Sequence, residues 1–250
     1  MQTRTEDREK GLMTSGGIYR QILYFSIPLL LGNLFQLMYN TIDSVVVGNY
    51  VGSTALAAVG ASTPVINLLI AFFMGLAVGA GVVVSRYFGA RRISEMSAAI
   101  HTFLAFSLWF GIGMSVFGML MSSLILHWIG VPADVFPQAD QYLSIYFAGN
   151  VFVTIYNAGT GVLQAVGDSR HPLYFLGVTS LLNVVLDLTF VRVFGWGVPG
   201  VAYATIISEA ISAVMVITEL CRTKREYRVD LHRLHMDRDK SILVITGPNM

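Results

Sequence analysis

Three stretches of this chain carry no Lys, Arg, Asp or Glu and are longer than one membrane crossing requires. They cover residues 44–85, 96–133 and 141–167. About 20 consecutive apolar residues span the hydrocarbon core of a bilayer, so these stretches predict transmembrane helices. Charged residues make up only 12% of the chain, roughly half the share of an average soluble domain. We therefore predict an all-α integral membrane protein. The minor alternative is a soluble protein with a large buried α-helical core.

Glycine, proline and charged residues divide the chain into six candidate transmembrane helices. We expect them at 22–47, 54–85, 94–128, 137–166, 172–194 and 199–221. The second and third are longer than one crossing needs, so they should tilt or project beyond the lipid. The sequence thus predicts a six-transmembrane-helix bundle.

Basic residues gather on one side of this predicted bundle. Of the 16 lysines and arginines, only Arg192 falls on the other side. The positive-inside rule places the basic side in the cytoplasm. With six spans, both termini are then cytoplasmic, and we expect a multi-pass protein of the cell membrane. Residues 1–20 are polar and the apolar run after them is long, which argues against a cleaved signal peptide.

The segments outside the bundle are short. We expect a cytoplasmic N-terminal segment at 1–21, the membrane lobe at 22–221, a basic linker at 222–240 and the start of a truncated seventh helix at 241–250. The linker's charges alternate in sign, so we expect a solvated segment near anionic headgroups rather than a specific lipid site.

Two aspartates, Asp43 and Asp187, lie within predicted membrane helices. Asp43 ends a stretch with no other charge since Arg20, and Asp187 follows a charge-free stretch from His171 to Leu186. An ionised carboxylate in hydrocarbon costs roughly 2.5–3.5 kcal/mol on insertion scales. Each aspartate has an asparagine on its own helical face, Asn40 before Asp43 and Asn183 before Asp187. A membrane chain that keeps two such groups is predicted to use them on an ion or proton path.

Further polar residues recur at helical spacing on four of the predicted helices. The stripes are Asn33, Gln36, Asn40 and Asp43; Asn150, Thr154, Asn157, Gly161 and Gln164; Ser180, Asn183 and Asp187; and Thr205, Ser208 or Glu209, and Ser212. Such stripes should face a water-filled cavity or one another, the alternative being four unrelated packing interfaces. The candidate cavity-lining residues are Gln36, Asn40, Tyr39, Asn33, Asn150, Thr154, Gln164, Ser180 and Glu209.

Topology gives the depth of the key residues. At 1.5 Å per helical residue, Asp43, Asp187 and Thr205 lie roughly 8, 12 and 9 Å below the outer surface. They are therefore predicted to share one layer, whereas Asn157 lies deeper and its membership is less firm.

Two carboxylates in one dry pocket cannot both remain ionised at low cost. They should share a proton, or bind a cation with oxygen ligands from Asn183 and Thr205. Either event changes the local charge by one, which can bias a bend at Pro28, where the helix lacks one backbone hydrogen bond. The alternative for Pro28 is a static kink. Glu209, a third buried acid, either contacts a cationic substrate or pairs with a neighbour.

Other classes of function lack support. The histidines lack metal spacing, Cys221 is the only cysteine, and no glycine-rich phosphate loop with a lysine is present. No serine has a plausible base nearby, so we predict a protein that is not an enzyme and has no cofactor beyond a coupling H⁺ or Na⁺. The net charge of +1 gives no indication of a nucleic-acid partner.

The chain resembles the N-terminal lobe of a MATE (multidrug and toxic compound extrusion) transporter from Ile18 to about Cys221. The resemblance is carried by 27–43, which ends in Tyr-Asn-Thr-Ile-Asp, by 161–170 (Gly-Val-Leu-Gln-Ala-Val-Gly-Asp-Ser-Arg), by 183–187 (Asn-Val-Val-Leu-Asp) and by 197–205 (Gly-Val-Pro-Gly-Val-Ala-Tyr-Ala-Thr). Together these segments are quite specific, although any one alone is weak.

The resemblance implies an antiporter that expels organic cations or drug-like molecules in exchange for protons or sodium. It assigns the coupling network to the matching positions Asp43, Asn157, Asn183, Asp187 and Thr205. It also implies twelve helices in two lobes, as alternating access requires. This chain carries one lobe, so we expect a truncated chain that lacks its C-terminal lobe, or a half-transporter that pairs with a second copy.

Two alternatives remain open. A flippase for lipid-linked saccharides, from the same superfamily, would favour a cavity lined by arginines, and only Arg192 near a helix end is available. A non-transporting membrane scaffold would need no coupling role for its buried acids.

Overall fold

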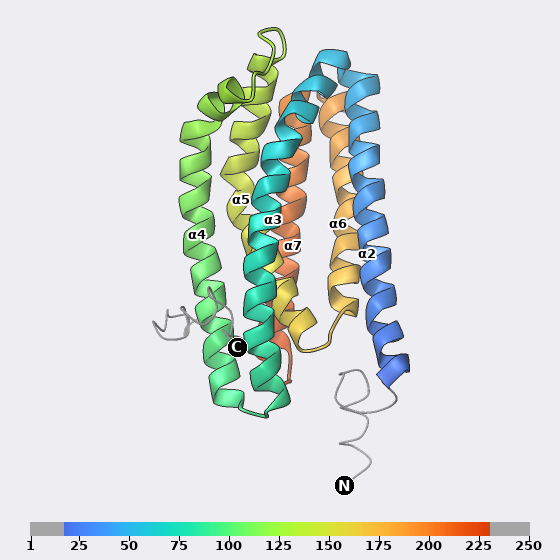
Figure 1. The fold of residues 1–250 in the computed structure, drawn as a ribbon. Helices are drawn as coiled ribbons and strands as arrows, with labels where there is room; N and C mark the ends of the chain where they lie inside the picture. Colours follow the sequence, from blue (N-terminus) through green and yellow to red (C-terminus); the bar gives the residue numbers. More distant parts are fainter. Residues whose placement is uncertain (1–17, 231–250) are drawn as a thin grey trace.

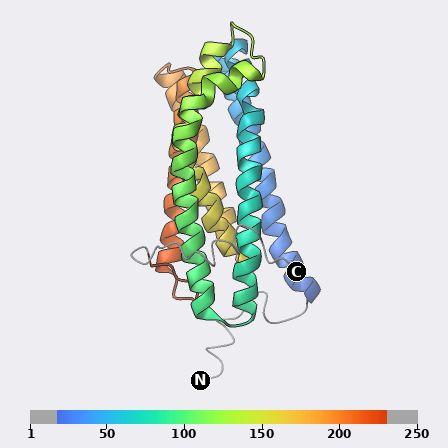
Figure 2. The same cartoon turned by 60° about the vertical axis from the view of Figure 1, so that its left-hand side comes forward.

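The computed structural model describes residues 18–230, which form six long helices and no strand. The helices are α2 (Ile18–Val46), α3 (Ser53–Gly89), α4 (Ile93–Trp128), α5 (Phe136–Ala165), α6 (Arg170–Leu188) and α7 (Val198–Arg222). All six run along one common axis (Figures 1 and 2). The predicted six-helix bundle is thereby confirmed. The expected start of a seventh helix at 241–250 lies outside the described residues, as does most of the N-terminal segment.

Two helices end in a feature that the sequence did not predict. A π-helical turn, η1 (Val47–Val51), follows α2, and a second, η2 (Thr189–Val193), follows α6. Each turn begins within a few residues of a buried aspartate, Asp43 or Asp187. Such turns are rare and occur frequently at functional sites.

The other helix ends follow from local chemistry. A proline stands in the first turn of both α5 and α7, where its missing N–H costs nothing. After α5, Gly167 adopts a φ of 87°. This left-handed turn lets the N–H of Gly167 donate to Gln164 O at 3.0 Å and the N–H of Asp168 donate to Leu163 O at 2.8 Å. The pair of bonds is a Schellman motif, which ends the helix.

Three helices, α3, α4 and α7, pack closely around α5. Glycines at the contact leave no room for a methyl group, because Gly118 of α4 faces Phe147 of α5 and Gly159 of α5 faces Val216 of α7. We call α3, α4, α5 and α7 the tight block. The remaining two helices, α2 and α6, lie side by side in Figure 1, and we call them the lateral pair. The lateral pair joins the block mainly where α6 packs on α7.

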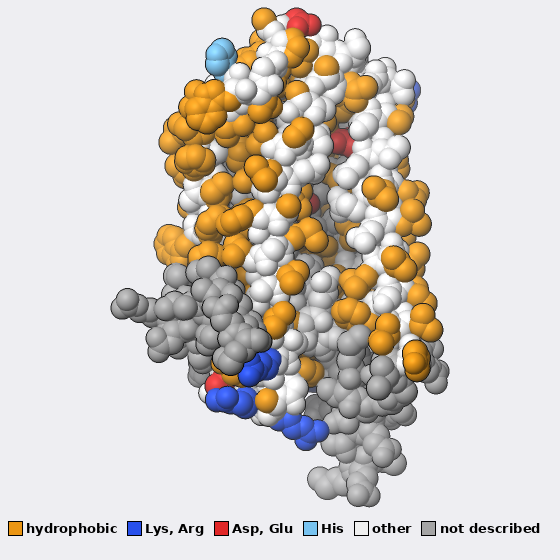
Figure 3. Space-filling view, viewed as in Figure 1, with side chains coloured by type: hydrophobic (Ala, Val, Ile, Leu, Met, Phe, Trp, Pro, Cys, Tyr) orange, Lys and Arg blue, Asp and Glu red, His pale blue; other side chains and the backbone are white. Residues whose placement is uncertain are grey.

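Four of the described helices are long and apolar enough to cross a membrane: α3, α4, α6 together with η2, and α7. The central helix α5 lies parallel to them but carries the polar stripe, which lowers its hydropathy. Apolar side chains are spread over much of the face of the bundle shown in Figure 3. With Leu120 and Leu68 more than two-thirds exposed, this surface suits lipid rather than water. The chain is a multi-pass membrane protein.

Arginines and lysines of the described residues gather at one end of the bundle, visible at the bottom of Figure 3. We call this the basic end. It holds the turn between α3 and α4, the start of α6 and the end of α7. Arg192, in η2, lies at the opposite end, which we call the far end.

The first residues after α7 fold back onto the bundle. Tyr227 is 1% exposed and Val229 is 2% exposed, and the N–H of Val229 donates to Leu220 O at 2.9 Å. The N–H of Asp230 donates to Nε2 of His101 in α4 at 3.0 Å. The expectation of a solvated linker is therefore wrong for these residues, because the two apolar side chains complete the core beneath α4 and α7.

Candidate functional site

Asp43 and Asp187 meet between α2 and α6, near the far end. Asp43 is 8% exposed and Asp187 is fully buried, and their carboxyl groups lie within hydrogen-bonding reach of each other. The two residues are 144 positions apart in the sequence (187 − 43) and come together because α2 packs along α6. Asp43 and Asp187 therefore lie at the same depth, as predicted, and they are in direct contact.

Each of these carboxyl groups has an oxygen, Oδ1, that is buried without a hydrogen-bond partner among the described residues. A buried polar atom left unpaired costs roughly 1–3 kcal/mol. Two adjacent carboxylates in a dry site cannot both remain ionised at low cost. The geometry therefore suits a shared proton or a bound cation between the two side chains.

Asn183 and Thr205 complete this layer. With the Asn183 amide oriented to satisfy its neighbours, its nitrogen donates to Asp187 Oδ2 at 2.8 Å and its oxygen accepts from the backbone N–H of Thr205 at 3.3 Å. Thr205 Oγ1 donates to Val201 O at 3.1 Å and lies 3.5 Å from the hydroxyl of Tyr39. We call Asp43, Asp187, Asn183, Thr205 and Tyr39 the aspartate cluster. It joins the lateral pair to α7.

Tyr142 of α5 is a member of this neighbourhood that sequence reasoning missed. Its side chain is 4% exposed and lies within electrostatic range of both Asp43 and Asp187. A signal was available, because Tyr142, Tyr146 and Asn150 recur every four residues and so extend the polar stripe of α5. Tyrosine is amphipathic, and a count of polar residues passes over it.

Glu209 occupies a separate small cleft one turn along α7. The cleft has a volume of about 20 Å³, and its lining comprises Gln36, Tyr39, Leu176, Thr179, Ser180, Asn183, Ser208, Glu209 and Ser212. It thus brings together predicted cavity residues from three helices, α2, α6 and α7. Acidic side chains are visible deep in the hollowed middle of the face shown in Figure 3.

Asn157 is placed apart from the aspartate cluster. Its amide nitrogen donates to Val153 O at 2.8 Å, and it lines a cleft of about 10 Å³ between α3, α4 and α5. Thr154 lines the same cleft, whereas Asn150 is buried nearby on α5 with its amide nitrogen unpartnered. The part of the α5 stripe at Thr154 and Asn157 therefore faces the interior of the tight block, whereas its extension at Tyr142 faces the two aspartates.

The remaining predicted residues lie along exposed or partly exposed faces. Asn33 and Asn40 are exposed on α2, as is the cleft residue Gln36, and Gln164 is half-buried near the end of α5. Helix α2 continues through Pro28 without a break.

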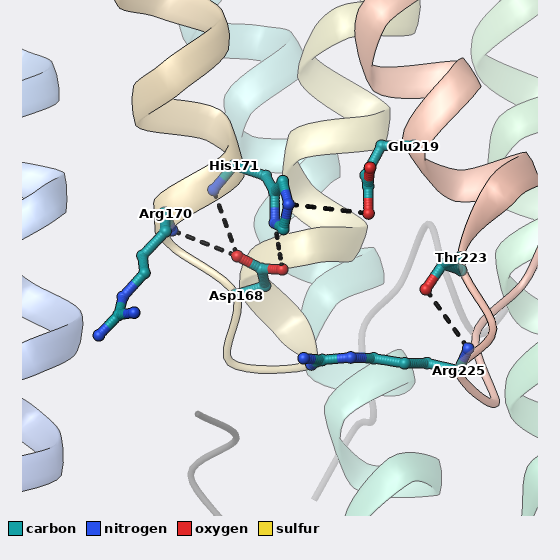
Figure 4. A network of polar contacts seen from close by, with 6 residues as sticks. All are labelled: Asp168, Arg170, His171, Glu219, Thr223 and Arg225. Carbon is teal, nitrogen blue, oxygen red and sulfur yellow. Dashed lines mark hydrogen bonds and ion pairs between the residues drawn. The ribbon is translucent and has the colours of Figure 1, made fainter. Parts of the chain in front are cut away.

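A second polar network lies at the basic end (Figure 4). Asp168 Oδ1 accepts from the backbone N–H groups of Arg170 and His171 at 3.2 and 3.3 Å, which caps the start of α6. Nδ1 of His171 lies 2.6 Å from Asp168 Oδ2, and its Nε2 lies 3.8 Å from Oε1 of Glu219 on α7. We call Asp168, His171 and Glu219 the basic-end network. It ties α6 to α7.

Solved structures define the class of this protein. The chain superposes with a TM-score of 0.85 at 27% identity on a structure titled "Crystal structure of MATE in the bent conformation", covering 92% of this chain and 51% of the other. A structure of MATE in the straight conformation matches with a TM-score of 0.85 at 28% identity, covering 94% and 53%. The fold is that of one lobe of a membrane transporter.

Sequence comparison identifies the family. The MatE family model matches residues 28–189, so the chain belongs to the MatE family. The chain is 35% identical over 199 residues to the probable multidrug resistance protein YpnP of Bacillus subtilis, covering 80% of this chain and 45% of that protein. It is 30% identical over 250 residues to the probable multidrug resistance protein YoeA of Bacillus subtilis, covering 98% and 54%. The chain spans about half the length of the curated relatives it matches.

Proposed function

We propose that this chain is the cation-coupled lobe of a multidrug exporter that exchanges organic cations or drug-like molecules for H⁺ or Na⁺. The observation that carries the proposal is the contact between Asp43 and Asp187, each with an unpartnered buried oxygen. Names of the relatives, which include the multidrug export protein MepA of Staphylococcus aureus, support export of drugs.

The coupling step follows from charge. A proton or Na⁺ that enters the aspartate cluster adds one positive charge between α2 and α6 and removes the repulsion between the two carboxyl groups. Release of the ion restores that repulsion. Since α2 packs mainly on α6 and lies at the edge of the bundle, its position is the most responsive to this change. Pro28 lowers the resistance of α2 to bending because it removes one backbone hydrogen bond.

The basic end supports a topology with both termini in the cytoplasm of a cell whose plasma membrane holds the protein. Substrate export by alternating access needs two packed repeats. We propose that the second repeat is a C-terminal lobe or a second copy of this chain. A saccharide flippase is disfavoured because Arg192 stacks over the Tyr50 ring at 5.6 Å, at the far end, rather than lining the Glu209 cleft.

Dye efflux from inside-out membrane vesicles or whole cells, with this chain joined to its second repeat in the full-length transporter, tests the coupling role. We expect Asp43→Asn and Asp187→Asn each to abolish efflux driven by an imposed proton or sodium gradient, at unchanged membrane expression. Asp140→Asn is the matched control, because Asp140 is satisfied by Ser122 at 2.7 Å and is not part of the aspartate cluster. Normal efflux in both cluster variants, or efflux indifferent to both gradients, contradicts the proposal.

A further inference from the structure

The Glu209 cleft is distinct from the aspartate cluster although the two are adjacent. Glu209 follows Thr205 by four residues on α7, which places it roughly 6 Å further along the helix axis. The cleft is lined from α2, α6 and α7, so it also lies where the lateral pair meets the tight block. Asn183 and Tyr39 are the residues that the cleft shares with the aspartate cluster.

Two polar groups in this cleft have no partner among the described residues. One is Oε2 of Glu209, and the other is Oγ of Ser208, whose side chain is 5% exposed. None of the ion pairs found between described residues involves Glu209. A buried carboxylate oxygen without a donor or a counter-charge is costly in a membrane protein. A cation bound in the cleft would therefore supply the counter-charge that the Glu209 carboxylate lacks among the described residues.

The neighbouring groups are oxygen ligands. Thr179 and Ser180 donate their hydroxyl hydrogens to the carbonyls of Phe175 and Leu176 at 2.8 and 2.6 Å. Because these hydrogens are engaged, the lone pairs of both hydroxyl oxygens remain available. Gln36 can supply a carbonyl oxygen. Carboxylate, hydroxyl and amide oxygens are the ligands that hard cations prefer.

Size and charge limit what can bind. A volume of about 20 Å³ holds a single water-sized particle, far less than a drug, whose pockets measure hundreds of cubic ångströms. One carboxylate neutralises one charge, which favours a monovalent ion over a divalent one. The titratable groups that face Glu209 are tyrosines, Tyr39 from α2 and Tyr146 and Tyr156 from α5, while α6 contributes only uncharged side chains to the cleft.

We propose that the Glu209 cleft is a second cation site, which binds one Na⁺ with Glu209 as its charged ligand and Ser208, Ser180, Thr179 and Gln36 as neutral oxygen ligands. This site is additional to the coupling pair, and Na⁺ binding in it does not require the carboxylates of Asp43 and Asp187. Asn183 lies in both sites, so an ion bound at one site can change the affinity of the other through this shared side chain.

Binding of ²²Na⁺ to the purified protein in detergent at pH 8 tests this site. We expect Glu209→Gln to lose one Na⁺ per chain. Glu219→Gln, on the same helix but in the basic-end network, is the matched control and should keep the wild-type stoichiometry. Unchanged stoichiometry in Glu209→Gln overturns the proposal. Absence of Na⁺ binding in the wild type also overturns it and would assign to Glu209 a proton alone.

Asp187→Asn separates this inference from the proposed coupling role. Retention of the Glu209-dependent Na⁺ in Asp187→Asn supports two independent sites, whether or not efflux needs Asp187. Loss of all Na⁺ binding in Asp187→Asn, with none lost in Glu209→Gln, leaves a single site and overturns the inference.

A milder variant guards against misfolding of Glu209→Gln. Ser208→Ala keeps the carboxylate and removes one neutral ligand, so we expect Na⁺ to bind roughly three- to tenfold more weakly with the stoichiometry unchanged. Wild-type affinity in Ser208→Ala, together with a Glu209→Gln protein that melts below the wild type in Na⁺-free buffer, would show that Glu209 acts on folding and overturns the proposal.

Discussion

Asp43 near the far end and Asp168 near the basic end are equally buried, at 8% exposure each, yet their surroundings differ completely. Asp168 accepts two backbone N–H groups and contacts His171, so both of its oxygens are used. Asp43 has an oxygen with no partner and faces a second carboxyl group. Equal burial therefore accompanies very different sets of partners, and under the proposed function this difference in partners separates a structural acid from a coupling acid.

The contrast has an energetic reason. A carboxylate that caps a helix and pairs with a histidine stabilises the fold. A carboxylate left unpaired in the membrane destabilises it until a proton or cation arrives. The first arrangement holds α6 to α7, and we propose that the second makes the position of α2 sensitive to a bound proton or cation.

The largest expected effect comes from the same substitution at both ends. Asp168→Asn should lower the free energy of unfolding by about 1–2 kcal/mol, because the amide pairs poorly with His171 and caps α6 less well. Asp187→Asn should leave stability unchanged or raise it, while efflux is abolished, a fall of at least roughly a hundredfold that is equivalent to about 2.7 kcal/mol or more of coupling. Thermal melts and efflux on the same preparations measure both.

The comparison of the two ends thus requires that Asp168→Asn loses stability and that Asp187→Asn loses efflux. If Asp187→Asn were the less stable variant and Asp168→Asn the less active one, the assignment of roles to the two ends would be reversed.

A smaller effect is expected at Thr205, which links the aspartate cluster to α7. Thr205→Val keeps the shape of the side chain and removes the hydroxyl that lies 3.5 Å from Tyr39. We expect efflux to fall roughly three- to tenfold, since one neutral hydrogen-bonding group is lost. Thr223→Val at the basic end, where the hydroxyl accepts from the N–H of Arg225 at 3.3 Å and also contacts the Tyr227 side chain, should transport normally. Equal efflux in the two variants would place Thr205 outside the coupling step.

The smallest effect concerns the folded-back segment at the basic end. Burial raises the pKa of Tyr227, so the folded protein holds this proton more tightly than the unfolded chain does. The corresponding stabilisation is present below the unfolded pKa of roughly 10 and is lost as the pH rises through the folded value. Tyr227→Phe should therefore lose less stability than the wild type between pH 8 and pH 10.5. Identical slopes of melting temperature against pH would contradict this account.

The helices could be predicted from sequence because their signals are local. Apolar runs, prolines at helix starts and glycines at helix ends are read residue by residue, and the predicted ends fall within a few residues of the observed ones. The π-helical turns could not be predicted from local signals; η1 and η2 contact each other although they lie far apart in the sequence. The burial of Tyr227 and Val229 also depends on a distant surface, beneath α4.

The aspartate cluster was partly predictable for a geometric reason. Counting from helix ends fixes depth along the membrane normal, which brought Asp43, Asp187 and Thr205 into one layer. It does not fix rotation about each helix axis. Asn157 was grouped with them by resemblance, yet it faces the space between α3 and α4. Tyr142, which faces the aspartates, was passed over for lack of the same rotational information.

The glycine contacts of the tight block have a mechanical consequence. A methyl group added to Gly118, Gly149 or Gly159 would collide with a side chain of the neighbouring helix, so α4, α5 and α7 cannot slide past one another without opening that interface. We therefore expect any displacement to be concentrated along one line, between α7 and the lateral pair. Both candidate cation sites lie on that line. Because α4, α5 and α7 are held rigidly together, a single bound ion is expected to move mainly the lateral pair, α2 and α6.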